Sequence, residues 1–199
     1  MGLSDSEILI PKPPEREERI SELDLIADQY YKRYNPPEHQ HKLDSDVVGL
    51  FNSLVKSSGR SCIMPMLEEL NHAIKPIILV HKEHFNQGRP ADLAYEIGKP
   101  VPFDYLESAQ TPSYPSGHAA QAFFFAHLLS DLFPDLSINL YELANMVAES
   151  RVDRGVHFPS DISAGKLLAR KLYDSTRSTA VSSISEGSLA KVRGYMKPE

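Results

Sequence analysis

The stretch Tyr114-Pro115-Ser116-Gly117-His118, followed by the apolar run from Ala119 to Phe133, decides the expected fold. The run contains no glycine or proline, and its phenylalanine and leucine residues fall on most faces of a helix. A helix that is apolar on most faces belongs in the middle of a bundle. Its first backbone N–H groups, and the positive end of its dipole, point at whatever lies above the Ser-Gly-His turn. The stretch therefore predicts a central helix that begins at an anion site.

The rest of the chain shows helical spacing of apolar residues and no β alternation of useful length. Further helices are expected over residues 17–34, 44–56, 65–86, 138–151 and 160–173. A loop is expected over residues 36–42, which begin with Pro36-Pro37. A second loop, with at most a short helical piece, is expected over the proline-rich residues 91–114. Pro76 is expected to kink or split its helix. The pattern predicts an all-α, single-domain helical bundle with a central apolar helix.

Composition sets the expected domain boundaries. Residues 1–16 are polar and contain Pro11, Pro13 and Pro14, which indicates an extended N-terminal arm. Residues 17–175 are expected to form the helical domain. The Ser/Thr-rich residues 176–199 are expected to form a C-terminal tail, with room for a short helix near Ser188–Tyr195.

The bulk properties exclude several classes of protein. With 199 residues, 41% of them hydrophobic, the chain can bury one sizeable core. A formal net charge of −6 argues against binding of nucleic acid or of an anionic membrane surface. The single cysteine excludes an internal disulfide. No apolar run is long enough to span a membrane, and the N-terminus lacks the features of a secretory signal. A cytoplasmic location is expected by default, or a periplasmic one if a signal has been removed.

Positively charged side chains in three separate segments suit the binding of phosphate. Lys82 and Arg89 are seven residues apart, which on one helix places them on nearly the same face. Arg151 is expected to converge with them, while Ser116 and the Gly117 N–H add neutral donors. Arginine offers a planar fork for phosphate oxygens and lysine a compact charge. The set predicts a site for a tetrahedral dianion, with surplus positive charge for a five-coordinate transition state.

Two histidines and one aspartate complete the expected site. Asp161 follows His157 by four residues, so its carboxylate can accept a hydrogen bond from one ring nitrogen and fix the tautomer. A histidine held in this way can act as a nucleophile. His118, beside the expected anion site, can then protonate the leaving oxygen and later activate water. Because one histidine must be neutral and the other charged, a bell-shaped pH profile on the mildly acidic side is expected.

These segments resemble the signature of the type 2 phosphatidic acid phosphatase superfamily. That superfamily includes class A bacterial non-specific acid phosphatases and vanadium-dependent haloperoxidases. The signature runs from Lys82 through Pro115-Ser116-Gly117-His118 to Asp161. The run from Ser113 to His118, and the short gap before Ser150, resemble the class A acid phosphatases most.

The resemblance implies a role for each residue of the signature. His157 would be the phosphohistidine nucleophile, His118 the general acid, and Asp161 the residue that orients His157. Phosphate would be held by Lys82, Arg89, Ser116, Gly117 and Arg151. The reaction would hydrolyse a small phosphorylated substrate and need no metal or cofactor, and vanadate would inhibit it. The family often forms dimers or larger assemblies, so a homo-oligomer is compatible with the resemblance.

Two other functions use the same residues. In a vanadate-dependent haloperoxidase the pocket would hold vanadate as cofactor, with His157 as its axial ligand, but those chains are generally longer, with a wider gap before the third segment. A non-catalytic phosphate-binding helical module would need no oriented nucleophile, so the pair of His157 and Asp161 argues against it. Considered alone, Ser116 can be interpreted as an ordinary helix cap. A pair of Lys and Arg residues can likewise be interpreted as the solvated edge of a helix. The sequence leaves the phosphate ester open.

Overall fold

The computed structural model describes residues 10–32 and 37–183, and every regular element within them is helical. The helices are α1 (Arg16–Lys32), α2 (Pro37–Ser45), α3 (Val47–Ser57), α4 (Met64–Phe85), α5 (Pro90–Glu96), α6 (Gly117–Leu132), α7 (Ser137–Asp153) and α8 (Pro159–Ser183). Two short 3-10 segments, η1 (Glu107–Ala109) and η2 (Pro134–Leu136), lie in the connections. The prediction of an all-α fold is confirmed for the described residues.

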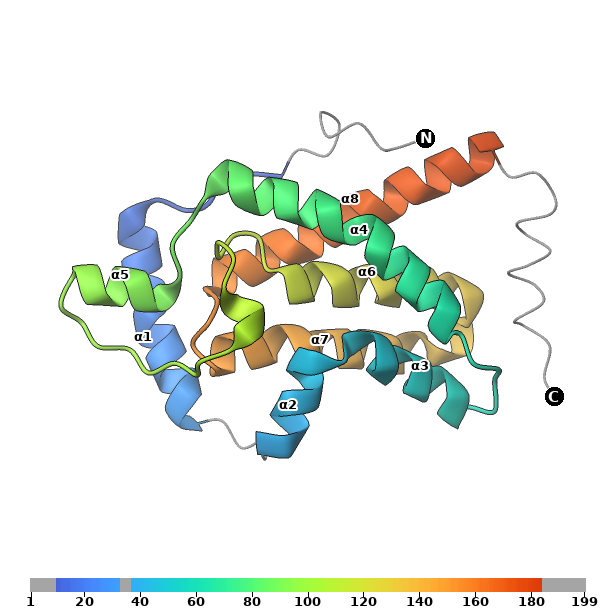
Figure 1. Ribbon diagram of the computed structural model, residues 1–199, viewed down its shortest axis with the longest axis horizontal. Coiled ribbons are helices and arrows are strands. Elements are labelled where there is room, and N and C mark those ends of the chain that lie inside the picture. The colour runs from blue at the N-terminus through green and yellow to red at the C-terminus, as the bar shows by residue number, and fades with distance from the viewer. Residues whose placement is uncertain (1–9, 33–36, 184–199) are drawn as a thin grey trace.

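Helix α6 is the centre of the bundle, as its apolar sequence predicts. It packs against α7 and α8 along most of its length and also contacts α4 and α3 (Figure 1). Phe124, Phe125 and Leu129 are fully buried, and the Phe125 ring meets the Phe51 ring of α3 edge to face at 5.6 Å between centroids. Each buried phenylalanine contributes about 1.5–3 kcal/mol, so α6 supplies much of the hydrophobic stabilisation.

The region of α2 and α3 differs from the loop and the single helix that the sequence predicts there. Residues 37–42 were expected to be a loop, but they belong to α2. Proline is tolerated in the first turn of a helix, where its missing N–H would have no partner, so Pro37 begins α2. The helix expected from residue 44 is instead interrupted at Asp46. The Asp46 side chain accepts a hydrogen bond from Gly49 N at 2.8 Å and caps α3.

Helix α4 continues through Pro76 without a split and ends at Phe85. Asn86 follows in the left-handed conformation, with φ of 45°. Arg89 is therefore the N-cap residue of α5 and is not on the same helix as Lys82. The expectation that these two cations share a helix face is wrong, and they reach the site from two different elements.

The two ends of the expected domain are only partly described. Residues 10–15 are not helical, and the Tyr114 hydroxyl donates to the carbonyl of Pro11 at 2.6 Å. At the other end α8 runs to Ser183, ten residues beyond the end expected near Tyr173. The short helix considered near Ser188–Tyr195 lies outside the described residues.

Four helix ends gather at one end of the bundle, on the left in Figure 1. They are the C-terminal ends of α4 and α7 and the N-terminal ends of α6 and α8. Gly165 lets α8 pack directly on the start of α6. A Cβ atom at this position would lie 2.6 Å from the Ser116 carbonyl oxygen and 2.9 Å from Ala119 Cβ. The close approach at Gly165 therefore places two helix N-termini side by side.

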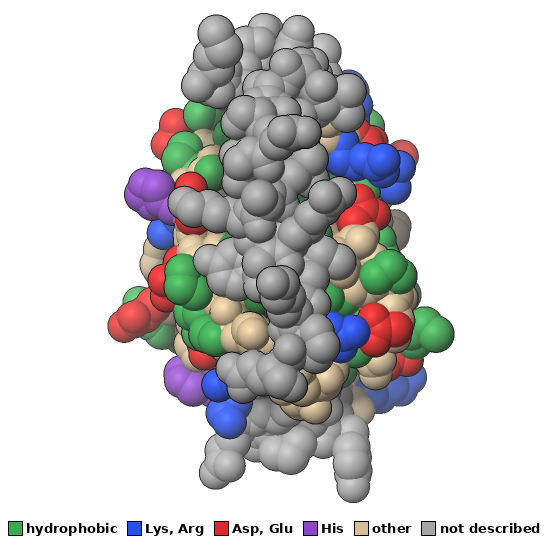
Figure 2. Space-filling view, turned by 90° about the vertical axis from the view of Figure 1, so that its right-hand side faces the viewer, with side chains coloured by type: hydrophobic (Ala, Val, Ile, Leu, Met, Phe, Trp, Pro, Cys, Tyr) green, Lys and Arg blue, Asp and Glu red, His purple; other side chains and the backbone are tan. Residues whose placement is uncertain are grey.

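The surface agrees with the acidic, mixed-charge composition. On the face shown in Figure 2, acidic and basic side chains alternate with hydrophobic ones on both sides of the residues that are not described. Across residues 10–32 and 37–183, no helix has both the length and the apolar character that a membrane crossing requires.

Candidate active site

His157 and Asp161 form the oriented pair that the sequence predicts. His157 lies in the connection between α7 and α8, and Asp161 lies in the first turn of α8. Their Nδ1 and Oδ2 atoms are 3.0 Å apart, and both side chains are almost completely buried. The tautomer with a proton on Nδ1 leaves the lone pair of Nε2 facing away from the carboxylate. Arg89 Nη1 lies 3.3 Å from this Nε2 atom.

Asp161 is itself held by several donors. Phe158 N donates to Oδ2 at 3.0 Å, and the Ser113 hydroxyl donates to the same oxygen. Gln87 Nε2 donates to Oδ1 at 3.0 Å. Burial raises the pKa of Asp161 to about 6, although the hydrogen bonds from Ser113 and Phe158 favour the carboxylate. The carboxylate is therefore ionised near neutral pH and loses its charge in mildly acidic solution.

His157 is neutral in this environment. Burial lowers its pKa well below the ordinary value, and the neighbouring charges of Arg89, Lys82 and Arg151 lower it further. Desolvation and nearby cations both disfavour an imidazolium. A neutral ring whose Nε2 atom carries no proton is the form that can act as a nucleophile, once a ligand replaces the contact with Arg89.

Lys82 and Arg89 reach the site from α4 and from the N-cap of α5. Lys82 Nζ donates to the carbonyls of Pro112 at 2.5 Å and Ser113 at 3.3 Å. Burial, together with the charge of Arg89, lowers the pKa of Lys82 to about 7. Burial also lowers the pKa of Arg89, to about 10, so this side chain stays charged. Both cations therefore adjoin the segment that leads into the Ser-Gly-His turn, where they also hold its backbone.

The Ser116-Gly117-His118 turn has the geometry of a helix start. Ser116 is the N-cap residue of α6, and its hydroxyl accepts a hydrogen bond from Ala119 N at 3.4 Å. Ser116 N donates to the main-chain oxygen of Asp161 at 3.0 Å, which ties this turn to the first turn of α8. The cap predicted for Ser116 is present, and the hydroxyl proton is left to donate to a ligand.

Arg151 is fully buried near the C-terminal end of α7. Its Nη1 atom is paired with the Asp44 carboxylate, and Nη2 donates to Ser108 Oγ at 3.0 Å. Its Nε atom is buried and has no hydrogen-bond partner within the described residues. A buried guanidinium with an unsatisfied N–H suits an anionic ligand.

His118 completes the cluster from the first turn of α6. Its Nε2 atom donates to the main-chain oxygen of Asp44 at 2.9 Å. Burial lowers the pKa of His118 to about 3, and the charge of Arg151 contributes to the shift. His118 also lies close enough to His157 to lower the pKa of that residue electrostatically. The structure thus brings His118, Arg151 and His157 together, as the sequence predicts.

Four polar residues around the site escape the sequence analysis: Asp44, Gln87, Ser108 and Ser113. Ser113 and Gln87 act on Asp161, whereas Asp44 and Ser108 act on Arg151. Asp44 and Ser108 lie in α2 and η1, both in or next to segments that were expected to be loops. Gln87 lies between Lys82 and Arg89, and Ser113 begins the run that leads to His118, so their position within the signature was the only available signal.

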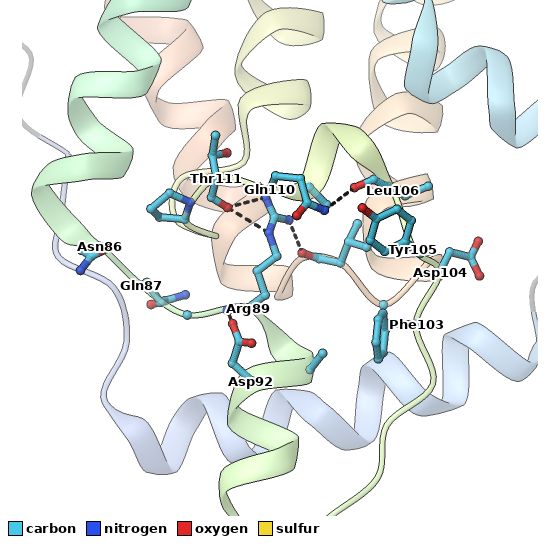
Figure 3. A pocket seen from close by; sticks show the side chains of 16 residues that line it. Asn86, Gln87, Arg89, Asp92, Phe103, Asp104, Tyr105, Leu106, Gln110 and Thr111 are labelled. Carbon is cyan, nitrogen blue, oxygen red and sulfur yellow. Dashed lines mark hydrogen bonds between the residues drawn. The ribbon is translucent and has the colours of Figure 1, made fainter.

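A cavity of about 480 Å³ opens beside the site, between α5, the loop of residues 103–112 and Gly155-Val156 (Figure 3). Arg89 forms its inner wall and donates to the carbonyls of Thr111 at 2.9 Å and Val156 at 2.6 Å. Phe103 and Tyr105 line its mouth, with 52% and 78% of their surfaces exposed. Arg89 thus joins the cavity to His157, whereas neither His157 nor His118 is among the residues that line the cavity.

Comparison with known proteins agrees with this geometry. Residues 70–171, slightly more than half of the chain, match the PAP2 superfamily, and they include every predicted site residue. The chain belongs to the PAP2 superfamily. The resemblance seen in the signature residues is thereby confirmed.

Two known proteins are similar to parts of this chain or to its fold. An acid phosphatase from Zymomonas mobilis subsp. mobilis is 37% identical over 57 residues, which are 29% of this chain and 22% of that protein. The match thus spans about a fifth of that relative's length. Among solved structures, a transmembrane PAP2 type phosphatidylglycerolphosphate phosphatase from Bacillus subtilis aligns with this chain at a TM-score of 0.56 and 18% identity. The alignment covers 84% of this chain and 88% of that one, which shows a shared fold.

Proposed function

We propose that this PAP2-superfamily protein hydrolyses phosphate monoesters through a phosphohistidine on His157, without a metal ion. The observation that carries the proposal is the 3.0 Å contact between His157 Nδ1 and Asp161 Oδ2, within a cluster of buried cations. A binding protein has no need for a buried histidine with a fixed tautomer. The substrate is proposed to be a small phosphorylated molecule.

In the first step, Nε2 of His157 attacks phosphorus and forms a P–N bond as the P–O bond to the ester oxygen breaks. The bonding electrons leave with the ester oxygen, which takes a proton from the imidazolium of His118. Asp161 stays ionised and stabilises the positive charge that develops on His157. The products of this step are an alcohol and a phosphohistidine.

In the second step, neutral His118 takes a proton from water as its oxygen attacks phosphorus. The P–N bond breaks, its electrons return to Nε2 of His157, and inorganic phosphate is released. His118 ends this step protonated, as it was when the ester bond broke, and the released phosphate carries that proton away. The two histidines therefore return to their initial states after each turnover.

Three cationic side chains supply the positive charge that a metal supplies in other phosphatases. Arg151 and Arg89 stay charged, and Lys82, with its pKa near 7, is charged in mildly acidic solution. Charge on the equatorial oxygens of a five-coordinate phosphorus is stabilised by such preorganised donors. The same arrangement fits trigonal-bipyramidal vanadate, which is therefore proposed to inhibit.

The pKa directions support an optimum in mildly acidic solution. Below about pH 6 a phosphate ester carries one proton on its phosphate group and can supply that proton to His118. As the pH rises above this value, the proton is lost and general-acid catalysis weakens. As the pH falls below 6, Asp161 with its pKa of about 6 becomes protonated and no longer stabilises His157. The two limbs give a bell-shaped profile.

Hydrolysis of a chromogenic aryl phosphate in the presence of EDTA tests the proposal. The wild-type protein is expected to hydrolyse the ester at an unchanged rate with EDTA, and His157→Ala is expected to abolish hydrolysis. His72→Ala, at an exposed position of α4, is the matched control and is expected to retain full activity. Activity that EDTA removes, or that survives in His157→Ala, would refute the mechanism.

A further inference from the structure

Asp44 is a largely buried but not fully enclosed carboxylate next to Arg151 and His118, although it lies outside the signature segments. It occupies the last turn of α2, and its side chain is 12% exposed. Its Oδ1 atom accepts hydrogen bonds from Arg151 Nη1 and from Ser108 Oγ, the latter at 2.5 Å. Burial opposes its ionisation, but the charge of Arg151 and the hydrogen bond from Ser108 outweigh that effect, so the pKa of Asp44 lies below its ordinary value. Asp44 is therefore an anion at any working pH.

The same residue makes two contacts with His118. Its main-chain oxygen accepts a hydrogen bond from Nε2 at 2.9 Å, and its Oδ1 atom lies 3.4 Å from Nε2. A proton fixed on Nε2 leaves Nδ1 as the ring nitrogen that can face a ligand. The two histidines therefore use different ring nitrogens. In His118 the fixed nitrogen is Nε2 and Nδ1 can face the ligand, whereas in His157 the fixed nitrogen is Nδ1 and Nε2 can face the ligand.

The other charges around His118 oppose its protonation. Arg151 from α7 and Lys82 from α4 both lower the pKa of His118, and burial lowers it more than either. Asp44 from α2 acts in the opposite direction through its carboxylate and its main-chain oxygen. His157, the other titratable group close to His118, is neutral. A general acid needs its proton at the moment the ester bond breaks, and the carboxylate of Asp44 is the group that favours this form.

We propose that Asp44 is a positioning residue that favours the acid form of His118 when an ester is bound, with Nδ1 directed at the leaving oxygen. The inference rests on the proposed function. The proton passes from His118 Nδ1 to the ester oxygen as the P–O bond breaks and the P–N bond to His157 forms. Asp44 stays ionised and paired with Arg151 throughout, so it exchanges no proton itself.

The need for this proton depends on the leaving group. A nitrophenolate is weakly basic and departs with little help from an acid, whereas an alkoxide is strongly basic and needs the proton. General-acid catalysis contributes roughly 10²–10⁴-fold where it is needed. Loss of the Asp44 charge is therefore expected to reduce the hydrolysis of alkyl phosphates far more than that of nitrophenyl phosphate.

The first experiment compares the wild type with Asp44→Asn on 4-nitrophenyl phosphate and glycerol 2-phosphate. Asparagine keeps the main-chain oxygen and a neutral acceptor for Arg151, so only the charge is removed. We expect kcat/KM to fall about 10²-fold or more for glycerol 2-phosphate, and less than about tenfold for the nitrophenyl ester. Equal losses for the two esters would overturn the proposal. Asp46→Asn, two residues away at a helix cap that asparagine also serves, is the control and is expected to leave both rates unchanged.

A second experiment reads the proton on His118 without using turnover. The protonation of His118 is followed by NMR with saturating inorganic phosphate, and the resonance is assigned with His118→Asn. An opposite charge at this distance typically moves a titration by 1–3 pH units, so the midpoint in Asp44→Asn is expected to be at least about one pH unit lower. An unchanged or higher midpoint would refute the role of Asp44. If the wild type hydrolyses no ester, the proposed function fails, while this titration still decides whether Asp44 sets the charge of His118.

Discussion

Replacing Asp161 by asparagine separates the orientation of His157 from the negative charge beside it. Oδ2 of Asp161 accepts from three donors: His157 Nδ1, Phe158 N and the Ser113 hydroxyl. The asparagine carbonyl can take the place of Oδ2 and keep all three. Its amide then faces Gln87 Nε2, which donates to Oδ1 in the wild type. Because Gln87 Oε1 is buried without a partner among the described residues, a flip of that amide replaces the donor–donor contact by a hydrogen bond.

The structure therefore predicts different effects for asparagine and alanine at this position. Asp161→Asn is expected to lower the free energy of unfolding by about 1.5 kcal/mol or less, because each donor keeps an acceptor. Asp161→Ala leaves these three donors and Gln87 Nε2 without an acceptor, at about 1–3 kcal/mol each, and is expected to cost about 4 kcal/mol or more. In the asparagine variant kcat is nonetheless expected to fall about 10²–10³-fold, because no charge stabilises the cation that forms on His157.

Urea unfolding followed by circular dichroism, combined with kcat on an aryl phosphate, measures both effects. Asp174→Asn is the matched control, since Asp174 lies on the same helix in an exposed pair with Arg170. It is expected to change the free energy of unfolding by less than about 1 kcal/mol and to leave kcat unchanged. Equal destabilisation by asparagine and alanine at position 161, or a normal kcat in Asp161→Asn, would refute the reasoning.

Further predictions concern pH, ligand, charge and packing. Between about pH 6 and pH 4 the unfolded chain binds a proton on both His118 and His157, whereas the folded protein binds one on Asp161 instead. The unfolded state thus holds about one more proton, and the free energy of unfolding is expected to fall by about 1.4 kcal/mol per pH unit as the pH decreases. Urea titrations across this range check it, and a flat profile would contradict it. Vanadate is expected to inhibit competitively and to raise the melting temperature, and inhibition without a change in melting temperature would argue against binding to the folded site. Lys82→Met is expected to lower kcat about 10²–10³-fold with a smaller change in KM, and a change in KM alone would assign Lys82 to ground-state binding. Gly165→Ala is expected to lower the free energy of unfolding by about 1–3 kcal/mol, because its Cβ meets backbone at the start of α6, and an unchanged melting curve would contradict that packing.

Local chemistry explains why much of the fold could be predicted. Helix α6 is apolar on most faces, and a helix of this kind has no stable position except the centre of a bundle. Ser116 carries a side chain suited to a helix start, and it is the N-cap of that helix. His157 and Asp161 are close in sequence, so their contact needs only the first turn of α8.

The errors arise where tertiary contacts override a local signal. The consecutive prolines at 36–37 indicated a loop, but proline is compatible with the first turn of α2. The spacing of Lys82 and Arg89 indicated a shared helix face, but Asn86 adopts a left-handed conformation and ends α4 between them. The two cations then reach the site from α4 and from the turn between α4 and α5, which residue spacing alone does not predict.

The role of Asp44 could not be predicted for the same reason. It lies 107 residues before its partner Arg151 and 74 residues before His118. No periodicity or motif connects positions so far apart, and a single aspartate near a helix end has an ordinary reading as a solvated charge. Only the packing of α2 against α7 brings its carboxylate to the site.

The most direct test of the account is to trap the covalent intermediate. The protein is mixed with an aryl [³²P]phosphate at mildly acidic pH, quenched within milliseconds in alkali, digested, and its labelled peptide sequenced. The account predicts an alkali-stable, acid-labile phosphohistidine on the peptide that contains His157, and no label in His157→Ala. Turnover of the ester without any labelled protein, or a label on a different residue, would contradict it.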